Sequence, residues 1–155
     1  MILLKNGRNS RNEYMSVLIK DNKIDKVFKQ KEDLYCVEDG IQVIDLNGKL
    51  ILSGIIDPHT HMRDPGLTMK EDFISGSRAC AKGGITTFID MPNTNPPTVT
   101  YESLLQKKEL AKQKSIVNYG FHFGGSRLGN INEIKKVVEN KLVSSVKIFL
   151  NVSTG

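Results

Sequence analysis

Apolar and polar positions divide the chain into two stretches of different texture. Residues 1–50 hold short apolar or alternating runs separated by polar clusters, a pattern typical of strands joined by tight turns. The expected strands are Ile2–Leu4, Val17–Ile19, Ile24–Phe28 and Gln42–Leu46. Turn residues lie at Asp21-Asn22-Lys23 and at Asn47-Gly48, where Asn-Gly is a strong signal for a two-residue hairpin. We therefore predict a small β unit at the start of the chain.

From Lys49 onwards, long apolar runs alternate with stretches of helical periodicity. This alternation is typical of βαβ units, in which helices cover a parallel sheet. The expected strands are residues 50–57 (LILSGIID), 86–91 (TTFIDM), 116–123 (IVNYGFHF) and 144–151 (SSVKIFLN).

Three helices are expected between these strands. The first has a capping box of Thr68 and Glu71 and ends at Gly83-Gly84. Its apolar face would hold Met69, Phe73, Cys80 and Ala81, and its small residues Gly76, Ser77 and Ala79 would allow close packing on the sheet. The second helix covers residues 101–114. The third starts at Asn130, with Glu133 three residues on, and carries apolar residues at helical spacing.

Four strands and three helices amount to about half of a (β/α)8 barrel, which needs about 250 residues and eight strands to pair every sheet edge. The chain is then either a piece of a longer polypeptide or closes its sheet by pairing with something else. A doubly wound open sheet of four strands would also suit this length. The pattern alone does not separate these folds.

Composition is that of a soluble globular domain. The chain has 155 residues, of which 39% are hydrophobic and 25% are charged, and a net charge of +5. The densest basic run is Lys107, Lys108, Lys112 and Lys114, which we interpret as a solvated helix face rather than a nucleic-acid surface. Cys36 and Cys80 form no disulfide framework, which favours a reduced, cytoplasmic chain. Neither a signal peptide nor a membrane-spanning run is present.

The segment around His59 and His61 carries the most chemistry. Residues two apart on a strand share a face, so Asp57, His59 and His61 are expected together at the carboxyl end of the first strand of the parallel sheet. Two neutral imidazoles placed this way can chelate one divalent ion, and zinc is the usual ion for nitrogen ligands. Surface or structural histidines are the alternative for such a pair. The buried strand before them and Arg-Asp-Pro-Gly after them favour the metal.

Three separated motifs then point to a family. HTHMRDPGLTMKEDF, GGITTFIDMPNTNPPT and VKIFLN occur in the order and at the spacing of the dihydroorotases, cyclic amidohydrolases of the amidohydrolase superfamily. From about Gly54 onwards the chain resembles the N-terminal half of that family. The resemblance implies an α/β fold, a (β/α)8 TIM barrel beside a small β-sandwich. Residues 1–50 would be the sandwich strands and residues 51–155 the first half of the barrel.

The resemblance also implies a site with two zinc ions. His59 and His61 would bind one of them, and Lys147 would react with carbon dioxide to form a carbamate that bridges both. The residues make this plausible, because Val146, Ile148 and Leu150 face one way and Lys147 faces the other. An ammonium group aimed into a barrel loses hydration, so the pKa of Lys147 should fall and free amine should become available. A lysine that reaches from a strand end to water is the alternative.

Arg63 and Asn93 are the expected substrate-binding residues. A guanidinium group can hold a carboxylate through two parallel hydrogen bonds, and dihydroorotate carries a carboxylate on its ring. Asn93 offers both a donor and an acceptor just after the second strand of the parallel sheet. Arg63 also favours a dihydroorotase over dihydropyrimidinases, whose substrates lack that carboxylate. The alternative for Arg63 is a surface ion pair with Asp64.

Other polar residues near the strand ends have open roles. His122, at the end of the third strand of the parallel sheet, is expected to be packed against its neighbours or to support a metal ligand rather than to bind a metal itself. Asp57 and Asp90 either orient metal ligands or accept hydrogen bonds from turn amides.

The family's remaining machinery has no counterpart in these residues. The resemblance implies two further zinc-binding histidines on barrel strands five and six and a general-base Asp on strand eight, which would lie beyond Gly155. We therefore expect these 155 residues alone to be inactive.

The implied function of the complete protein is zinc-dependent, reversible hydrolysis of dihydroorotate to N-carbamoyl-aspartate in pyrimidine synthesis. Alternatives are another cyclic amidohydrolase, such as an allantoinase or dihydropyrimidinase, and a non-catalytic barrel that serves as a scaffold for a partner such as a transcarbamoylase. A homo-oligomer is expected, with no nucleic-acid or membrane partner.

Overall fold

The chain forms two compact units, Met1–Ser53 and Gly54–Gly155. They were characterised in a computed structural model, which describes residues 1–31, 40–126 and 129–150. Cys36 and Asn151, both part of the expectations above, lie outside the described residues.

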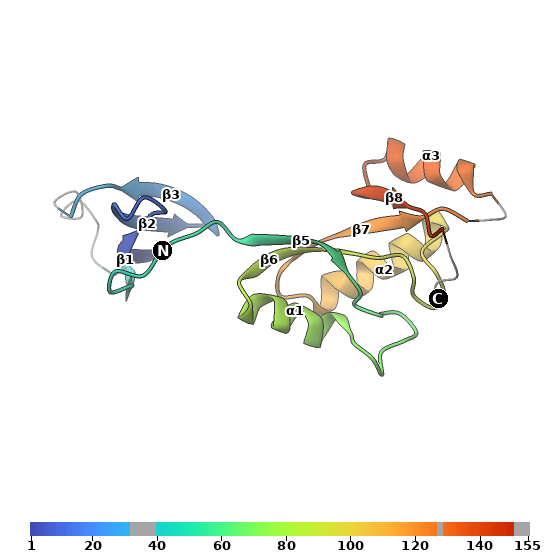
Figure 1. Cartoon of the computed structure of the whole chain (residues 1–155), viewed down its shortest axis with the longest axis horizontal. Coiled ribbons are helices and arrows are strands. Elements are labelled where there is room, and N and C mark those ends of the chain that lie inside the picture. The colour runs from blue at the N-terminus through green and yellow to red at the C-terminus, as the bar shows by residue number, and fades with distance from the viewer. Residues whose placement is uncertain (32–39, 127–128, 151–155) are drawn as a thin grey trace. The chain divides into compact units, whose positions relative to one another are not determined.

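The first unit is a four-stranded sheet with the strand order β3-β2-β1-β4 (Figure 1). Its strands are β1 (Ile2–Arg8), β2 (Tyr14–Lys20), β3 (Lys23–Phe28) and β4 (Gln42–Asp45). Strands β1, β2 and β3 pair antiparallel, whereas β4 pairs parallel to β1. Asp21 and Asn22 have φ angles of 50° and 59°, the left-handed backbone of a tight two-residue hairpin turn. All four strands expected here are confirmed.

The hairpin expected at Asn47-Gly48 does not form, although the turn itself does. Both residues have positive φ, and the Lys49 amide donates to the Leu46 carbonyl at 2.9 Å. The chain after this turn lies beside β1 instead of returning along β4, because Leu50 forms a parallel bridge with Arg8. The sequence signal was correct for the turn but could not say which strand the next segment would join.

The second unit is a parallel sheet with the strand order β5-β6-β7-β8, and three helices connect its strands (Figure 1). Its elements are β5 (Ile55–Thr60), α1 (Phe73–Lys82), β6 (Ile85–Asp90), α2 (Tyr101–Lys114), β7 (Asn118–Gly124), α3 (Ile131–Glu139) and β8 (Ser145–Lys147). Within the described residues, the expected alternation of four strands and three helices is confirmed.

An aromatic core joins the sheet to its helices. Phe88 of β6 and Phe121 of β7 pack against Phe73 of α1, with ring centroids 6.1 and 6.4 Å from that of Phe73. Leu104 and Ala111 of α2 are fully buried in the same cluster. Because side chains alternate across a strand, the residues next to these phenylalanines point to the opposite face of the sheet.

The start of α1 differs from the prediction. Asp72, not Thr68, is the N-cap, and its carboxylate accepts from the Ser75 amide at 2.7 Å in a reciprocal capping box. Met69 is 99% exposed and lies outside the helix, and Ala81 is also exposed. Thr68 with Glu71 matches the usual capping-box pattern, whereas Asp72 is followed at that position by Ser75 instead of Glu or Gln. The usual pattern therefore predicted the wrong cap.

Strand β5 is also displaced from its expected range. It begins at Ile55 rather than residue 50 and continues to Thr60, so His59 lies on the strand itself. Strand β8 is short, and its residues Ser145–Lys147 lie in the first half of the predicted range 144–151.

The N-cap position of α3 is Asn130, as expected, but its side chain makes no cap hydrogen bond. The Asn130 amide group instead donates to the carbonyls of Val99 and Gly124, and Glu133 accepts from the Tyr101 amide at the start of α2. These two side chains join neighbouring elements rather than closing their own helix.

None of the helices in the described residues combines the length and apolar character that a bilayer crossing requires.

Candidate metal and substrate site

The predicted functional residues lie at the carboxyl ends of parallel strands. His59 is at the end of β5 with His61 just beyond it, Asn93 follows β6, and Lys147 is the last residue of β8. The register pairs Thr60 with Asp90 and Gly124 with Lys147, so these ends belong to one edge of the sheet. In α/β barrels this edge carries the site, because its loops can vary without disturbing the sheet.

The two histidines lie side by side. Their ring centroids are 5.4 Å apart, with the ring planes tilted by 55°. The regular alternation on which the prediction rested does not hold here, because the register shifts between Asp57 and Thr60. The Asp57 carboxylate accepts from the His59 amide at 3.0 Å, which holds this irregular end of the strand. The pairing of the rings, however, is as expected.

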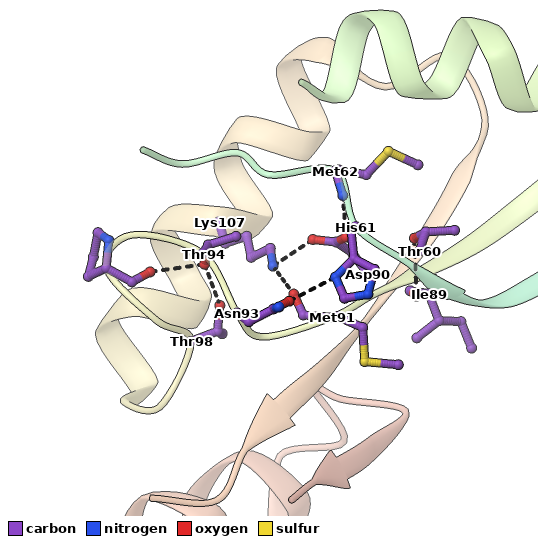
Figure 2. Close-up of polar contacts among 11 residues, drawn as sticks. Thr60, His61, Met62, Ile89, Asp90, Met91, Asn93, Thr94, Thr98 and Lys107 are labelled. Carbon is purple, nitrogen blue, oxygen red and sulfur yellow. Dashed lines mark hydrogen bonds and ion pairs between the residues drawn. The ribbon is translucent and has the colours of Figure 1, made fainter. Parts of the chain in front are cut away.

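His61 is oriented by Asn93. Its Nδ1 lies 2.8 Å from the Asn93 side-chain oxygen, which can only accept, so Nδ1 donates and the Nε2 lone pair is left to bind another group (Figure 2). Burial lowers the pKa of His61, and the nearby positive charge of Arg63 acts in the same direction. The neutral ring with a fixed tautomer is the form that a metal requires.

These residues fit part of a zinc site. Two adjacent imidazoles supply nitrogen ligands of the preferred type, but a catalytic zinc takes three protein ligands. Within residues 1–31, 40–126 and 129–150, no group of three or more His, Cys, Asp and Glu side chains is placed to hold a metal. The His59–His61 pair is therefore an incomplete site that needs at least one ligand of another kind or from elsewhere.

Lys147 is half-buried at the end of β8, and its carbonyl accepts from the Gly125 amide at 2.9 Å. Its Nζ lies 5.2 Å from the centroid of the Phe149 ring. Register pairs Lys147 with Gly124, two residues beyond His122 on the same side of β7. Lys147 and His122 therefore share the sheet face that lies opposite the aromatic core.

Arg63 follows the histidines at a special backbone position. Its φ of 58° is unusual for a residue with a side chain, and such conformations cluster at functional sites. Asp64, the partner in the alternative interpretation of Arg63, forms an ion pair with Lys114. The Asp64 carboxylate lies 2.6 Å from Lys114 Nζ at the end of α2, and Asp64 is buried.

A buried ion pair lies next to His61 and Asn93, and sequence reasoning missed it. Lys107 Nζ lies 2.6 Å from Asp90 Oδ2 and donates to the Met91 carbonyl at 2.8 Å, and both charged side chains are 0% exposed (Figure 2). The other Asp90 oxygen accepts from the Met62 amide at 2.7 Å, next to His61. Burial lowers the pKa of Lys107 despite the opposing effect of Asp90. The interpretation of Lys107 as a solvated residue is therefore wrong, whereas Lys114 is partly exposed and pairs with Asp64.

Helical spacing could have revealed Lys107. The buried residues of α2 are Leu104, Lys107 and Ala111, which follow one another at intervals of three and four. A lysine on an apolar stripe signals a buried partner, because an unpaired internal charge is too costly. Because Lys107 belongs to the densest basic run of the chain, we interpreted it from its charge and not from its position on the helix.

The loops after β5 and β6 are in direct contact. The Asn95 amide donates to the Pro65 carbonyl at 3.1 Å and joins the two loops. Within the second loop, the Thr94 hydroxyl donates to the Pro96 carbonyl at 2.9 Å. Gly66 has a φ of 83°, and a Cβ added to it would lie 1.9 Å from the Asn95 carbonyl oxygen. Only glycine fits this crossing, which fixes the loop of Arg63 against the loop of Asn93.

Replacing Gly66 with Ala should therefore destabilise the protein by more than the left-handed backbone alone costs, which is about 1–2 kcal/mol. Gly84→Ala is the matched control, since Gly84 has a φ of 81° but no atom within 4 Å of an added Cβ. Free energies of unfolding from denaturant titration should rank G66A well below G84A. Equal losses would show that the two loops do not constrain each other at Gly66.

Comparison with known proteins places this arrangement in a family. Residues 50–150 match the model of the amidohydrolase family, a range that includes His59, His61, Arg63, Asn93 and Lys147. The chain belongs to the amidohydrolase family. This confirms the resemblance seen in the three motifs.

Individual relatives of this amidohydrolase chain agree with that assignment. A dihydroorotase from Methanosarcina mazei is 41% identical over 99% of the chain and 33% of the relative. An allantoinase from Streptomyces avermitilis is 38% identical over 74% of the chain and 25% of the relative. Among solved structures, an L-hydantoinase (dihydropyrimidinase) from Arthrobacter aurescens superposes with a TM-score of 0.86 at 32% identity, covering 99% of the chain and 34% of that structure.

The expected fold class is confirmed by these comparisons: the parallel sheet is part of the barrel of this family. The chain spans about a third of the length of the curated relatives it matches.

Proposed function

We propose that this chain supplies the first metal-binding strands and the carboxylate-recognition loop of a dihydroorotase, which hydrolyses dihydroorotate reversibly to N-carbamoyl-aspartate. The observation that carries the proposal is the paired imidazoles of His59 and His61, with Arg63 two residues beyond them. The relatives support it, because dihydroorotases 34–42% identical match nearly the whole chain.

His59 and His61 would hold a zinc ion, and a carbamate on Lys147 would bridge it to a second one. Asn93 keeps His61 in the tautomer that exposes Nε2. The Asp90 carboxylate accepts from the Met62 amide, and Lys107 neutralises Asp90. The backbone beside His61 is therefore held by a buried ion pair. When bound, zinc supplies an activated water and polarises a carbonyl group.

Hydrolysis adds the oxygen of water to the ring carbonyl carbon, breaks the ring C–N bond and transfers a proton to the departing nitrogen. In the proposed reaction Arg63 binds the ring carboxylate and so places the amide bond over the metals. Asn93 would contact the same substrate carboxylate while its oxygen holds His61. Fixing the ring at one end in this way lowers the entropy cost of reaching the reactive geometry.

The direct test is turnover by the full-length gene product, purified with zinc, of four ring substrates: dihydroorotate, dihydrouracil, hydantoin and allantoin. Only dihydroorotate carries a ring carboxylate. We expect kcat/KM to be highest for dihydroorotate. The allantoinase and hydantoinase among the relatives favour the second candidate, another cyclic amidohydrolase. Preference for allantoin or hydantoin would establish that candidate, and no turnover of any ring would contradict both.

Arg63 provides the specificity prediction. Truncating one partner of a buried charge pair costs about 2–5 kcal/mol, so Arg63→Ala should lower kcat/KM for dihydroorotate by about 30-fold or more. Arg63→Lys keeps the charge but loses the paired hydrogen bonds, so its kcat/KM for dihydroorotate should lie between those of wild type and R63A. Bound zinc, measured by elemental analysis, should be unchanged in both variants. Full activity in R63A would exclude carboxylate recognition by Arg63.

A further inference from the structure

His122 of β7 makes a hydrogen bond at each of its ring nitrogens. Nε2 lies 2.7 Å from the Pro58 carbonyl oxygen in β5, and Nδ1 lies 2.7 Å from the Ser145 hydroxyl in β8. The residue is only 9% exposed. One imidazole therefore contacts both edge strands of the β5-β6-β7-β8 sheet, including β5, with which β7 shares no backbone pairing.

The Pro58 carbonyl determines that Nε2 of the ring carries a proton. A carbonyl oxygen only accepts hydrogen bonds, so Nε2 carries the proton and donates to Pro58. In the neutral ring Nδ1 then accepts from the Ser145 hydroxyl. Neither nitrogen retains a lone pair for a metal, so the structure agrees with the expectation that His122 is a packed or supporting residue and not a ligand.

On β7, the bridge starts just beyond the last residue that pairs with β6. The last pair of the β6–β7 ladder is Asp90 with Phe121, so His122 is the first residue of β7 beyond it. Within the described residues, β6 pairs with β7 no further than Asp90, so beyond that level no strand ladder connects β5 through β6 to β7 and β8. The His122 side chain makes the connection instead, from the face of the sheet that carries Lys147.

Both ends of the bridge are next to proposed metal ligands. Pro58 directly precedes His59, and Ser145 is two residues before Lys147 on the same face of β8. We propose that His122 is a positioning residue, which sets the separation between the His59–His61 pair and Lys147. This inference rests on the proposed function, since it concerns the geometry of that metal centre.

Two variants separate the bridge from simple packing. In His122→Gln the side-chain amide reaches the place of Nε2 and keeps a donor for Pro58, whereas in His122→Asn it reaches only the place of Nδ1. Zinc titration of the metal-free full-length gene product should give a Kd within about threefold of wild type for H122Q. Changes behind metal ligands cost about 10–100-fold in metal affinity, and H122N should fall in that range. Ser145→Ala removes the β8 anchor, as H122N removes the β5 anchor, so its zinc Kd should also rise by about 10–100-fold.

Two further measurements make the outcomes distinct. Thermal unfolding of the metal-free variants reports packing, and ¹⁵N NMR of histidine reports the His122 tautomer without any metal. A large loss of stability with an unchanged zinc Kd in H122N, or equal zinc losses in H122N and H122Q, would overturn the positioning role. A proton on Nδ1 instead of Nε2 would overturn the bridge itself. If wild type shows the bridge in NMR but binds no zinc, the proposed metal centre fails, and the role of His122 fails with it.

Discussion

Lys107→Met should lower the free energy of unfolding by about 3–5 kcal/mol, because it leaves the Asp90 carboxylate buried without a counter-charge. The Asp90 side chain is completely enclosed and also holds the Met62 amide. Loss of the ion pair should therefore disturb the backbone next to His61 as well as the core. Urea titration of the full-length gene product measures the stability change, and zinc content measures the effect on the site.

Lys112→Met on the same helix is the control. Lys112 is exposed and makes only a long contact of 3.9 Å with Glu109, so its removal should change stability by no more than about 0.5 kcal/mol. A double variant, Asp90→Leu with Lys107→Met, should recover part of the loss because no buried charge remains. If K107M were as stable as K112M, the ion pair would contribute nothing and the support assigned to it would be wrong.

Lys147→Met should lower dihydroorotate turnover by more than about a hundredfold, beyond the range of changes behind a metal ligand. Methionine preserves the volume of the side chain but cannot form a carbamate, so the proposed bridge between the metals is lost. His59→Asn and His61→Asn should have effects of similar size and should also lower bound zinc. Steady-state kinetics and elemental analysis of the same preparations check both expectations.

The matched control for Lys147 is Lys135→Met, which replaces an exposed lysine of α3 and should leave kcat unchanged. A short carboxylic acid added to K147M offers the missing anionic oxygen ligand and should restore part of the activity. Full activity of K147M without such an additive would remove Lys147 from the site.

The sequence predicted elements well where the information is local. The second helix of the parallel unit was placed at its observed bounds, and in the structure Thr100 caps its start. The predicted start of α1 was wrong because Thr68 and Glu71 match the usual capping-box pattern, whereas the observed box pairs Asp72 with Ser75. Asn130 failed as a cap because its side chain serves neighbouring elements.

The candidate site was predicted in outline from strand-end positions and family motifs. The contact between Asn93 and His61 could not be predicted, because it depends on how two loops cross at Gly66. Lys107 was misread for a different reason: its charge suggested solvent, while its helical position indicated the core. His122 contacts Pro58, which is 64 positions away in the sequence, and Ser145, which is 23 positions away. No local sequence pattern signals such contacts.

A crystal structure of the full-length gene product, grown with zinc and analysed by anomalous scattering at the zinc edge, tests the central claim most directly. We expect one zinc bonded to His59 and His61, and a carboxylated Lys147 that bridges it to a second zinc. Zinc bound elsewhere, or an unmodified Lys147 ammonium directed away from an occupied His59–His61 pair, would contradict the account.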